Sequence, residues 1–313
     1  MSPSCTLKPR HRSMINSHYL YFLKHNIVNR ISRSREPLLA SFKLTYRCNL
    51  RCRSCPFWKI PSSDMPYETA IQRMDSLHEM GVRLLIFEGG EPFLWRDGER
   101  RLNDLVRYAK DKFYCTGMTT NGTLPLDTPA DVIWVSLDGM RESHDANRGD
   151  GVFEKVITNI RASTHPRILV NVTVNSLNVR DIPELVRSLY DDVKGFTIQF
   201  HYPYTESEDL SLTHEQRVLV LEQMLALKRD GYPVLNSRAT LEALKENRWK
   251  CHPWLIANVE PDGEMHVGCY VQHRTAVACD KCGFAVHTEI SKAYDWNWEA
   301  IVTGRRIFGF RII

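Results

Sequence analysis

Short apolar segments alternate with helical segments between residues 39 and 235, and this alternation restricts the fold more than any other feature. The intervening segments carry apolar residues at helical spacing, as in Ile71, Met74 and Leu77. Strands joined by helical crossovers form a parallel sheet that is covered by helices. We therefore predict an α/β fold, a partial (β/α)6 parallel barrel with a small C-terminal Cys-rich β-hairpin/helix extension. The predicted strands are residues 39–46, 83–88, 113–120, 132–137, 168–174 and 196–201.

The chain of 313 residues divides into three regions. Residues 1–38 form a basic amphipathic N-terminal arm, residues 39–235 the partial barrel, and residues 236–313 a Cys-rich region that follows a change in composition near Trp249. One large domain with a smaller appendage suits a chain of this length.

Composition places the chain among ordinary globular proteins and excludes several functional classes. It is 43% hydrophobic and 25% charged, and it has neither an apolar run of about 18 residues nor a signal peptide. We therefore expect a cytoplasmic protein, whose nine cysteines are better explained by metal than by disulfides. A net charge of +4 is too small to indicate a nucleic-acid partner.

The N-terminal arm concentrates positive charge on a helical pattern. Residues 19–28 predict an amphipathic helix, on which four apolar side chains recur at helical spacing. One interpretation is a helix packed on the main domain with a solvated basic face. The other is a helix resting on an anionic membrane surface, which would make the protein peripheral to the membrane. The apolar residues are Leu20, Leu23, Ile27 and Ile31, and the basic ones are Lys8, Arg10, Arg12, Lys24, Arg30, Arg33 and Arg35, against Glu36 alone.

Three cysteines, Cys48, Cys52 and Cys55, lie on the loop after the first predicted strand. Thiolates are soft ligands that suit iron–sulfur clusters and zinc. A structural zinc site needs four protein ligands, and neither a fourth Cys nor a His is near in sequence. Three thiolates on a four-iron cubane leave one iron free for an outside ligand. The segment therefore predicts a 4Fe-4S cluster with an open coordination site.

Other unusual residues also follow predicted strands. The turn Gly89-Gly90-Glu91-Pro92 comes after the second strand, Asn121 after the third and Asp138 after the fourth. The carboxyl ends of parallel strands meet at one edge of the sheet, so we expect these residues to gather around the cysteines. The sequence therefore predicts a single site at that edge.

The spacing Cys48-x3-Cys52-x2-Cys55 resembles the motif of the radical S-adenosylmethionine (SAM) superfamily, and the resemblance covers residues 39–235. It implies an enzyme of transferase or oxidoreductase type. In such an enzyme these cysteines, the candidate catalytic and iron-ligating residues, hold a 4Fe-4S cluster bound to SAM. The cluster cleaves SAM to a 5′-deoxyadenosyl radical. A low-potential electron donor such as ferredoxin or flavodoxin is implied as a partner.

The same resemblance implies roles for the residues after the other strands. In the family the Gly-Gly-Glu-Pro turn cradles the methionine ammonium group, a polar pair holds ribose and carboxylate, and further residues border the adenosine. Ser54 stands where many members have an aromatic residue, so Phe57 or Trp58 would flank the adenine. The implied cofactor-binding residues are Gly89, Gly90, Glu91, Pro92, Asn121, Ser136, Asp138, Arg148 and Asn171, with Thr173 and Gln199 nearby.

A second group of cysteines comprises Cys251, Cys269, Cys279 and Cys282. The segment between the first two predicts a β-hairpin that turns at Asp262-Gly263. This arrangement resembles the twitch/SPASM-like extension of radical SAM enzymes, which encloses an auxiliary 4Fe-4S cluster. Zinc held by four thiolates is the alternative, and His287 is a further candidate ligand.

Two cysteines remain, Cys5 and Cys115. We expect Cys5 to be inert. Cys115 begins the third predicted strand, where a small buried hydrophobic side chain is the ordinary interpretation. The alternative hypothesis is that its thiol donates a hydrogen atom to a product radical.

The substrate is indicated only by a narrower resemblance. Cys251-His252-Pro253-Trp254 and Cys269-Tyr270 resemble segments of the hopanoid-type adenosyl-transfer radical SAM enzymes. This resemblance implies an isoprenoid or other lipid substrate, modified by adenosyl addition or hydrogen abstraction, and the aromatic stretch 200–204 could wall its pocket. The alternatives are a peptide- or small-molecule-modifying radical SAM enzyme and a non-enzymatic iron–sulfur or zinc protein.

Overall fold

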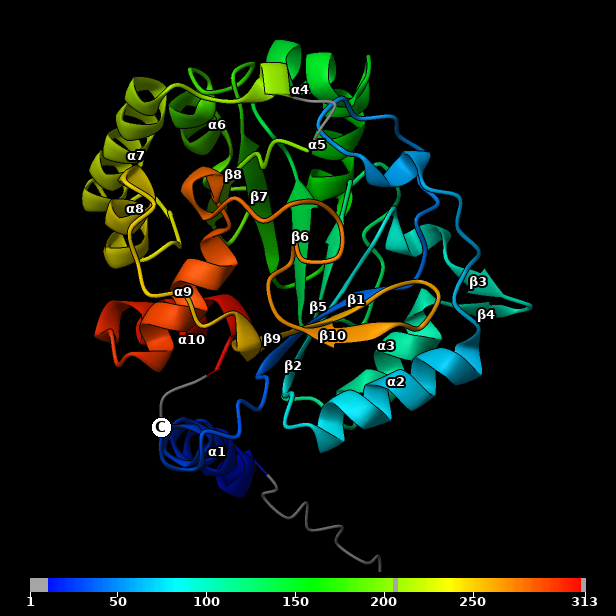
Figure 1. The fold of residues 1–313 in the computed structure, drawn as a ribbon. Coiled ribbons are helices and arrows are strands. Elements are labelled where there is room, and N and C mark those ends of the chain that lie inside the picture. Colours follow the sequence, from blue (N-terminus) through cyan, green and yellow to red (C-terminus); the bar gives the residue numbers. More distant parts are fainter. Residues whose placement is uncertain (1–10, 205–207, 311–313) are drawn as a thin grey trace, which may run out of the picture.

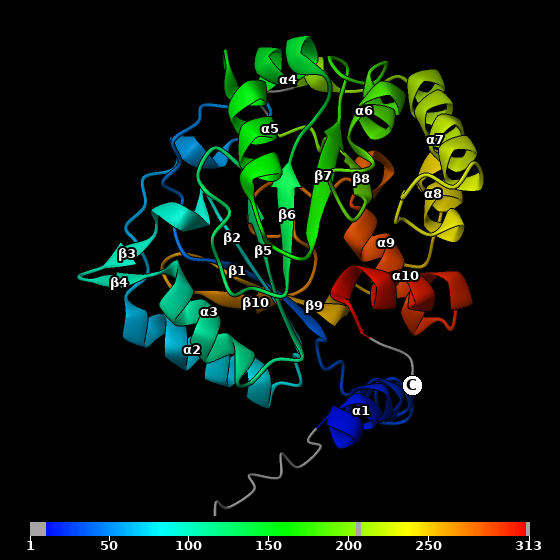
Figure 2. The ribbon, with the colours of Figure 1, turned by 180° about the vertical axis from the view of Figure 1, so that it is seen from behind.

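An eight-stranded sheet forms the centre of the protein, in the order β10-β9-β1-β2-β5-β6-β7-β8. The computed structural model describes residues 11–204 and 208–310. Helices cover the outer face of the curved sheet (Figures 1 and 2), so the predicted α/β fold is confirmed. The strands are β1 (Leu39–Lys43), β2 (Leu84–Glu88), β5 (Cys115–Thr120), β6 (Val132–Ser136), β7 (Ile168–Val174), β8 (Phe196–Phe200), β9 (Ile256–Val259) and β10 (Met265–Val267), with a separate hairpin of β3 (Arg96–Asp97) and β4 (Arg100–Arg101).

The helices between the strands make the parallel crossovers. Their apolar sides pack on the outer face of the sheet, where Phe42, Phe87 and Met118 are fully buried. The helices are α1 (His11–Ser32), α2 (Tyr67–Glu79), α3 (Leu102–Lys110), α4 (Arg141–Arg148), α5 (Val152–Ala162), α6 (Ile182–Leu189), α7 (His214–Arg229), α8 (Arg238–Lys245), α9 (Ala285–Tyr294) and α10 (Trp298–Phe308), with short 3-10 turns at Phe57–Lys59, Pro92–Leu94, Glu208–Leu210, Pro253–Leu255 and Cys279–Lys281.

The C-terminal region is continuous with the barrel. The predicted hairpin forms as β9 and β10, and β9 pairs in parallel with β1, with Leu39 opposite Ile256. All four residues of β9 are buried, as expected for a strand enclosed on both faces. The sheet therefore extends beyond the six predicted strands, because β1 would otherwise present an unpaired edge.

An apolar layer closes the barrel at the amino ends of its strands. It is built from residues near the amino ends of six strands, including Leu39, Val132 and Leu169, and Ile307 of α10 packs against it. Polar chemistry inside the barrel is therefore restricted to the carboxyl half of the strands.

The helix α1 is longer than predicted, and the orientation of its apolar residues differs from the packed-helix interpretation. Its described inner face consists of aromatic and polar side chains: His18 stacks on Tyr114 at 4.0 Å, and Asn26 donates to the Tyr294 carbonyl at 2.8 Å. Leu20, Leu23, Ile27 and Ile31 are all exposed, so the predicted apolar row faces outward. Lys8, Arg10 and Cys5 lie outside the described residues, and among those described no helix is both long and apolar enough to cross a membrane.

A buried carboxyl group joins α9 to the start of α8. Glu289 Oε1 accepts from the Ser237 backbone N–H at 2.5 Å, and burial raises the pKa of Glu289 to about 7. In the pH range between its unfolded pKa of about 4.3 and the folded value, the folded state binds the extra proton. The protonated Glu289 side chain therefore contributes stability that is complete below about pH 4.3 and is lost as the pH rises through about 7.

We expect Glu289→Gln to remove this pH dependence. In urea unfolding between pH 5 and 7, the free energy of unfolding of the wild type should fall relative to the variant by about 1.4 kcal/mol per pH unit. Ser237→Ala, which leaves the backbone donor in place, is the control and should retain the wild-type slope. Equal slopes for the wild type and Glu289→Gln would contradict the assignment.

Candidate active site

The three cysteines of the predicted motif converge at the carboxyl end of β1. Cys52 is buried, whereas Cys48 and Cys55 are partly exposed. The pKa of Cys52 is raised to about 11, mainly by burial and to a smaller extent by the nearby Cys55 and Cys48 thiolates. The loop is tied to α4, because the Arg53 and Ser54 N–H groups donate to Asn147 at 2.9 and 3.1 Å. The structure therefore gathers three thiols beside one another at the predicted edge.

The Gly-Gly turn after β2 packs directly on the backbone that leads into the cysteine loop. Gly90 N–H donates to the Thr45 carbonyl at 2.7 Å, and Glu91 N–H donates to the Arg47 carbonyl at 2.9 Å. A Cβ atom on Gly90 would lie 2.1 Å from the Arg47 carbonyl oxygen. The glycines are thus required for a close approach within the chain itself, which fixes the position of Cys48.

Glu91 supports the site from behind. Its side chain is fully buried, and its carboxylate accepts from Thr120 Oγ1 and from the Asn121 N–H, each at 2.8 Å. Asn121 in turn donates to Asn49 Oδ1 at 2.8 Å and lies 3.7 Å from Cys48 Sγ. The carboxylate expected to receive the methionine ammonium group is therefore enclosed by donors of its own chain, and it holds Asn121 against the cysteine loop.

Asp138 and Arg148 form a buried ion pair next to the cysteines. Arg148 Nε donates to Asp138 Oδ2 at 2.7 Å, with side-chain exposures of 12% and 0%. Asn147 Nδ2 and the Thr173 N–H complete the carboxylate's hydrogen bonds, at 2.9 and 3.0 Å. Burial opposes ionisation, but the Arg148 charge and these bonds hold the pKa of Asp138 below its usual range.

The charge of Arg148 also acts on the thiols. It lowers the pKa of Cys52 against the larger effect of burial, so it favours the thiolate that binds iron. Asn147 was not expected from the sequence, although it lies one position before Arg148. Both side chains come from α4, a helix that was not expected from the sequence.

The remaining predicted residues fall on the inner face of the sheet. Ser136 and Asn171 are register partners on β6 and β7, and Asn171 Oδ1 accepts from Thr197 Oγ1 at 3.0 Å. Side chains two positions apart on a strand share a face, so uncharged polar groups line the carboxyl half of the barrel. The partly exposed members are Thr119, Ser136, Asn171, Thr173, Thr197 and Gln199.

The two aromatic residues predicted to flank the adenine, Phe57 and Trp58, differ in their surroundings. Trp58 Nε1 donates to the Cys52 carbonyl at 3.1 Å, so its ring stays beside the cysteine loop. Phe57 is buried and stacks on Tyr46 at 5.5 Å. Pro92 is buried at the start of a 3-10 turn, where it shapes the Gly-Gly turn without an exposed surface.

A charged network that the sequence did not reveal joins the barrel to the Cys-rich region. Lys43 Nζ lies 3.1 Å from Glu88 Oε1 and 3.8 Å from Glu260 Oε1, and Glu260 also pairs with Arg274 and Tyr46. The Lys43 and Arg274 side chains are 1% and 8% exposed. The only signal in the sequence was a lysine at the end of a buried strand, because its partners come from distant segments.

The four cysteines of the second group also lie near one another. The pKa of Cys282 is raised to about 11, mainly by burial and to a smaller extent by the neighbouring Cys269, Cys251 and Cys279 thiolates. Within the described residues, no set of three or more Cys, His, Asp or Glu side chains is drawn in closely enough to hold a single ion. His287 is buried, and its Nε2 accepts from the Tyr270 N–H at 3.2 Å, so the fold already uses this nitrogen.

The aromatic stretch after β8 takes two roles: Phe200, His201 and Pro203 line a surface cavity, whereas Tyr202 packs against the second cysteine group. Tyr202 stacks on Phe284, with ring centroids 5.8 Å apart. The Tyr202 hydroxyl donates to the Ala276 carbonyl at 2.8 Å and accepts from the Ala278 N–H at 2.9 Å. The interpretation as the wall of an apolar pocket is therefore wrong for Tyr202, which anchors the Cys-rich loop.

Cys115 lies in the apolar layer at the amino ends of the strands, with 1% exposure. Burial raises the pKa of its thiol well above the usual range. A hydrogen-atom donor must reach the substrate at the other end of the barrel, so this position contradicts that hypothesis. We expect Cys115→Ala to retain SAM cleavage and full product formation, at a cost of about 1 kcal/mol in stability, measured by thermal unfolding and product analysis; a loss of product alone would restore the hypothesis.

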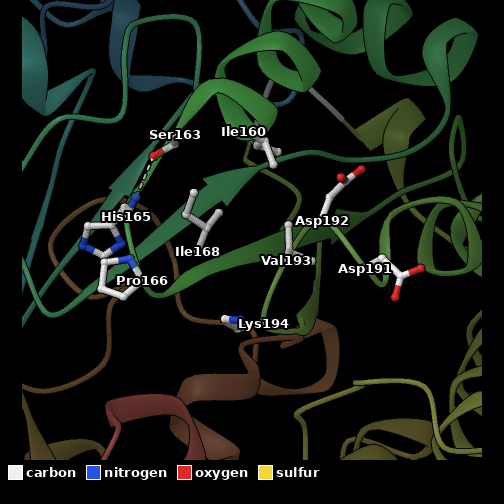
Figure 3. A pocket seen from close by; sticks show the side chains of 9 residues that line it. All are labelled: Ile160, Ser163, His165, Pro166, Ile168, Asp191, Asp192, Val193 and Lys194. Atoms are coloured by element: carbon white, nitrogen blue, oxygen red, sulfur yellow. Dashed lines mark hydrogen bonds between the residues drawn. The ribbon is translucent and has the colours of Figure 1, made fainter.

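Two surface cavities lie apart from the first cysteine group. Figure 3 shows one at the amino ends of β7 and β8, between Ser163–Ile168 and Asp191–Lys194. The other lies beyond the carboxyl ends of the same strands, next to Asp280 and Lys281 in the second cysteine region. The first lies at the wrong end of the barrel for the predicted chemistry.

Comparisons with known proteins agree with this geometry. Residues 42–189 match the family model described as the Radical SAM superfamily, and residues 196–300 match a domain of unknown function, DUF3463. The Streptococcus suis SuiB structure with bound S-adenosylmethionine superposes with a TM-score of 0.64 at 13% identity, over 94% of this chain and 72% of SuiB, and this likeness concerns the fold.

Similar sequences come from several curated enzymes. The Fe-coproporphyrin III synthase of Methanosarcina barkeri is 29% identical over 74% of this chain and 61% of the relative. The pre-heme d1 synthase of Dinoroseobacter shibae is 33% identical over 56% of this chain and 46% of the relative. The subtilosin biosynthesis protein AlbA of Bacillus subtilis is 29% identical over 56% of this chain and 42% of the relative. The chain thus spans about half the length of these relatives. They are not hopanoid-type enzymes, which corrects the narrower resemblance.

Proposed function

We propose that this chain, which belongs to the radical SAM superfamily of enzymes, cleaves SAM and uses the resulting 5′-deoxyadenosyl radical to modify a polar small molecule. The observation that carries the proposal is the convergence of Cys48, Cys52 and Cys55 beside the Asp138–Arg148 ion pair. Three thiols with a neighbouring fixed cation suit a cluster that keeps one iron open.

The residues present fit a 4Fe-4S cluster and SAM. The family binds both, and the cluster supplies the electron that breaks the C5′–S bond of SAM. In this chain, Gly90 and Glu91 fix the cysteine loop, and Asn121 braces Cys48. Arg148 provides a positive charge toward the cysteines, while Ser136 and Asn171 offer hydrogen bonds on the inner face.

The inner face supports a polar substrate more than a hydrocarbon. Thr119, Thr197 and Gln199 add hydroxyl and amide groups to those of Ser136 and Asn171. A buried polar group without a partner costs free energy, so an alkene would leave such groups unsatisfied. Two relatives are named for tetrapyrrole products, Fe-coproporphyrin III and pre-heme d1, so a tetrapyrrole with free carboxylates is the substrate class we favour.

The second cysteine group is assigned to an auxiliary 4Fe-4S cluster. What supports this assignment is that the four thiols lie near enough to raise one another's pKa, as the four ligands of one cluster would. A low-potential donor such as ferredoxin or flavodoxin would deliver the electrons.

The test is an anaerobic reaction of reconstituted protein with SAM and dithionite. Iron coproporphyrin, a peptide library and membrane lipids are added separately, and 5′-deoxyadenosine and modified substrate are followed by mass spectrometry. We expect substrate-dependent 5′-deoxyadenosine with the tetrapyrrole. Modification of lipid alone would refute the substrate class, whereas the absence of SAM cleavage in every reaction would refute the activity.

A peptide substrate is the second candidate, because AlbA, a bacteriocin biosynthesis protein, is also similar over 56% of this chain. Peptide main chains carry the amide groups that the inner face can pair with. Modification of the peptides and not of the tetrapyrrole would establish this candidate.

A further inference from the structure

The helix α1 presents a row of apolar side chains to the outside. Leu20 and Ile31 are 64% and 80% exposed, and Leu23 and Ile27 are 45% and 43% exposed. Their spacing places them on one side of the helix, and we call these four residues the outer row. Other large apolar side chains, such as Ile60 and Leu219, are also exposed but lie on separate elements, whereas these four follow one another along one helix face. A contiguous exposed row of this kind indicates a binding surface.

The orientation of the outer row is fixed by polar contacts on the opposite side of α1. Tyr21 Oη donates to the Gly81 carbonyl at 2.5 Å, and a His25 ring nitrogen lies 2.9 Å from the Glu36 carbonyl oxygen. His25, Asn26 and Asn29 are buried there. Rotating the helix to bury the outer row would break these bonds and expose this face. The exposure of the row is therefore a consequence of how α1 docks.

The surroundings of the outer row are basic. Lys24 is exposed one helical turn from Leu20, and Arg33 and Arg35 are exposed directly after the helix. Residues 18–35 contain no acidic residue, and Arg30 already pairs with Asp295 of the C-terminal region. Trp296, next to Asp295, is 50% exposed and adds an aromatic ring of the kind found at bilayer interfaces.

We propose that the outer row docks on the surface of an anionic lipid bilayer, with α1 lying in the plane of the interface. The apolar row would enter the boundary between headgroups and acyl chains, and Lys24, Arg33 and Arg35 would meet lipid phosphates. A second copy of the chain is a poorer occupant, because a two-fold interface would bring together two copies of the same basic surface, whose like charges repel.

The docking leaves the proposed active site accessible. Figures 1 and 2 show α1 at the end of the barrel from which the strands point away, whereas the cysteine loops lie at the carboxyl ends. A bilayer under α1 would therefore face the closed, apolar end of the barrel. This inference goes beyond the proposed function and does not depend on a lipid substrate.

The test uses the reconstituted full chain in vesicle co-sedimentation. We expect about tenfold or more stronger binding to vesicles of phosphatidylcholine with phosphatidylglycerol than to phosphatidylcholine alone, and weaker binding at high salt. The double variant Leu20→Glu with Ile27→Glu should lose this binding, and Lys24→Glu should weaken it. The matched control is Leu219→Glu on α7, since Leu219 is 55% exposed and far from α1 in sequence.

Two outcomes would overturn the proposal. Equal binding of the wild type and the double variant, with both retaining iron content and circular dichroism, would show that another surface binds lipid. A dimer in sedimentation velocity that the double variant dissociates, without vesicle binding by the wild type, would assign the outer row to a second copy.

Discussion

Replacing Cys52 with alanine should abolish 5′-deoxyadenosine formation. Mutating a residue that only orients a metal ligand typically lowers metal affinity or activity about 10- to 100-fold. Loss of a ligand itself should lower activity by more than that. Cys52 is the most buried thiol of its group, and water cannot readily take its place. The measurement is 5′-deoxyadenosine by liquid chromatography, together with iron content and electron paramagnetic resonance of the reduced protein.

Variants of the other cysteines provide the controls. Cys115→Ala should keep both iron content and SAM cleavage, because Cys115 lies in the apolar layer at the other end of the barrel. Cys279→Ala should lose the iron of the second group while the first group still cleaves SAM. Unchanged SAM cleavage in Cys52→Ala would remove the basis for the proposed function.

Replacing Arg148 with methionine should destabilise the protein by about 3–5 kcal/mol, because it leaves the Asp138 carboxylate buried without its counter-charge. The pKa of Asp138 is lowered in the wild type, so its contribution to stability is present above the unfolded pKa of about 3.9 and is lost as the pH falls through the folded value. In the variant, burial without a counter-charge should raise the pKa of Asp138, so its carboxylate takes up a proton as the pH falls. The gap between wild type and variant, measured by urea unfolding, should therefore be large at pH 7 and should shrink toward pH 4.

The double variant Arg148→Met with Asp138→Asn separates burial from charge. It removes both charges, so it should recover part of the stability that Arg148→Met loses. SAM cleavage should remain impaired in both, because Arg148 is the cation beside the cysteines. A double variant as unstable as the sum of its parts would show that the ion pair is not the source of the effect.

The sequence allowed the central part of the fold to be predicted. The six crossover strands were placed within three residues of their observed ends, because alternation of apolar and helical patterns is a local property. The hairpin turn at Asp262-Gly263 was found for the same reason, and Gly263 has the left-handed backbone that such a turn favours, with φ at +85°. The assembly of Cys48, Glu91, Asn121 and Asp138 at one edge followed from strand direction.

Contacts between distant segments could not be predicted in this way. The helix α4, which carries Asn147 and Arg148, is short and polar, so its periodicity gave little signal. The carboxylates that pair with Lys43 come from β2 and from the turn after β9, and Glu260 is shared with Arg274; no local pattern indicates which charges meet. The resemblance implies that Glu91 binds SAM, but only the tertiary structure shows that its carboxylate is enclosed by donors of Thr120 and Asn121.

The sequence by itself thus determined the strands, their direction and the chemistry of the first cysteine loop, because these depend on spacing and periodicity along the chain. The tertiary structure decided that β9 joins β1, that Cys115 is sealed in the apolar layer and that α1 turns its outer row away from the barrel. Each of these features depends on which segments, far apart in the sequence, pack against one another in the folded chain. That choice is set by the free energy of burying both partners together, to which segments far apart in the sequence contribute.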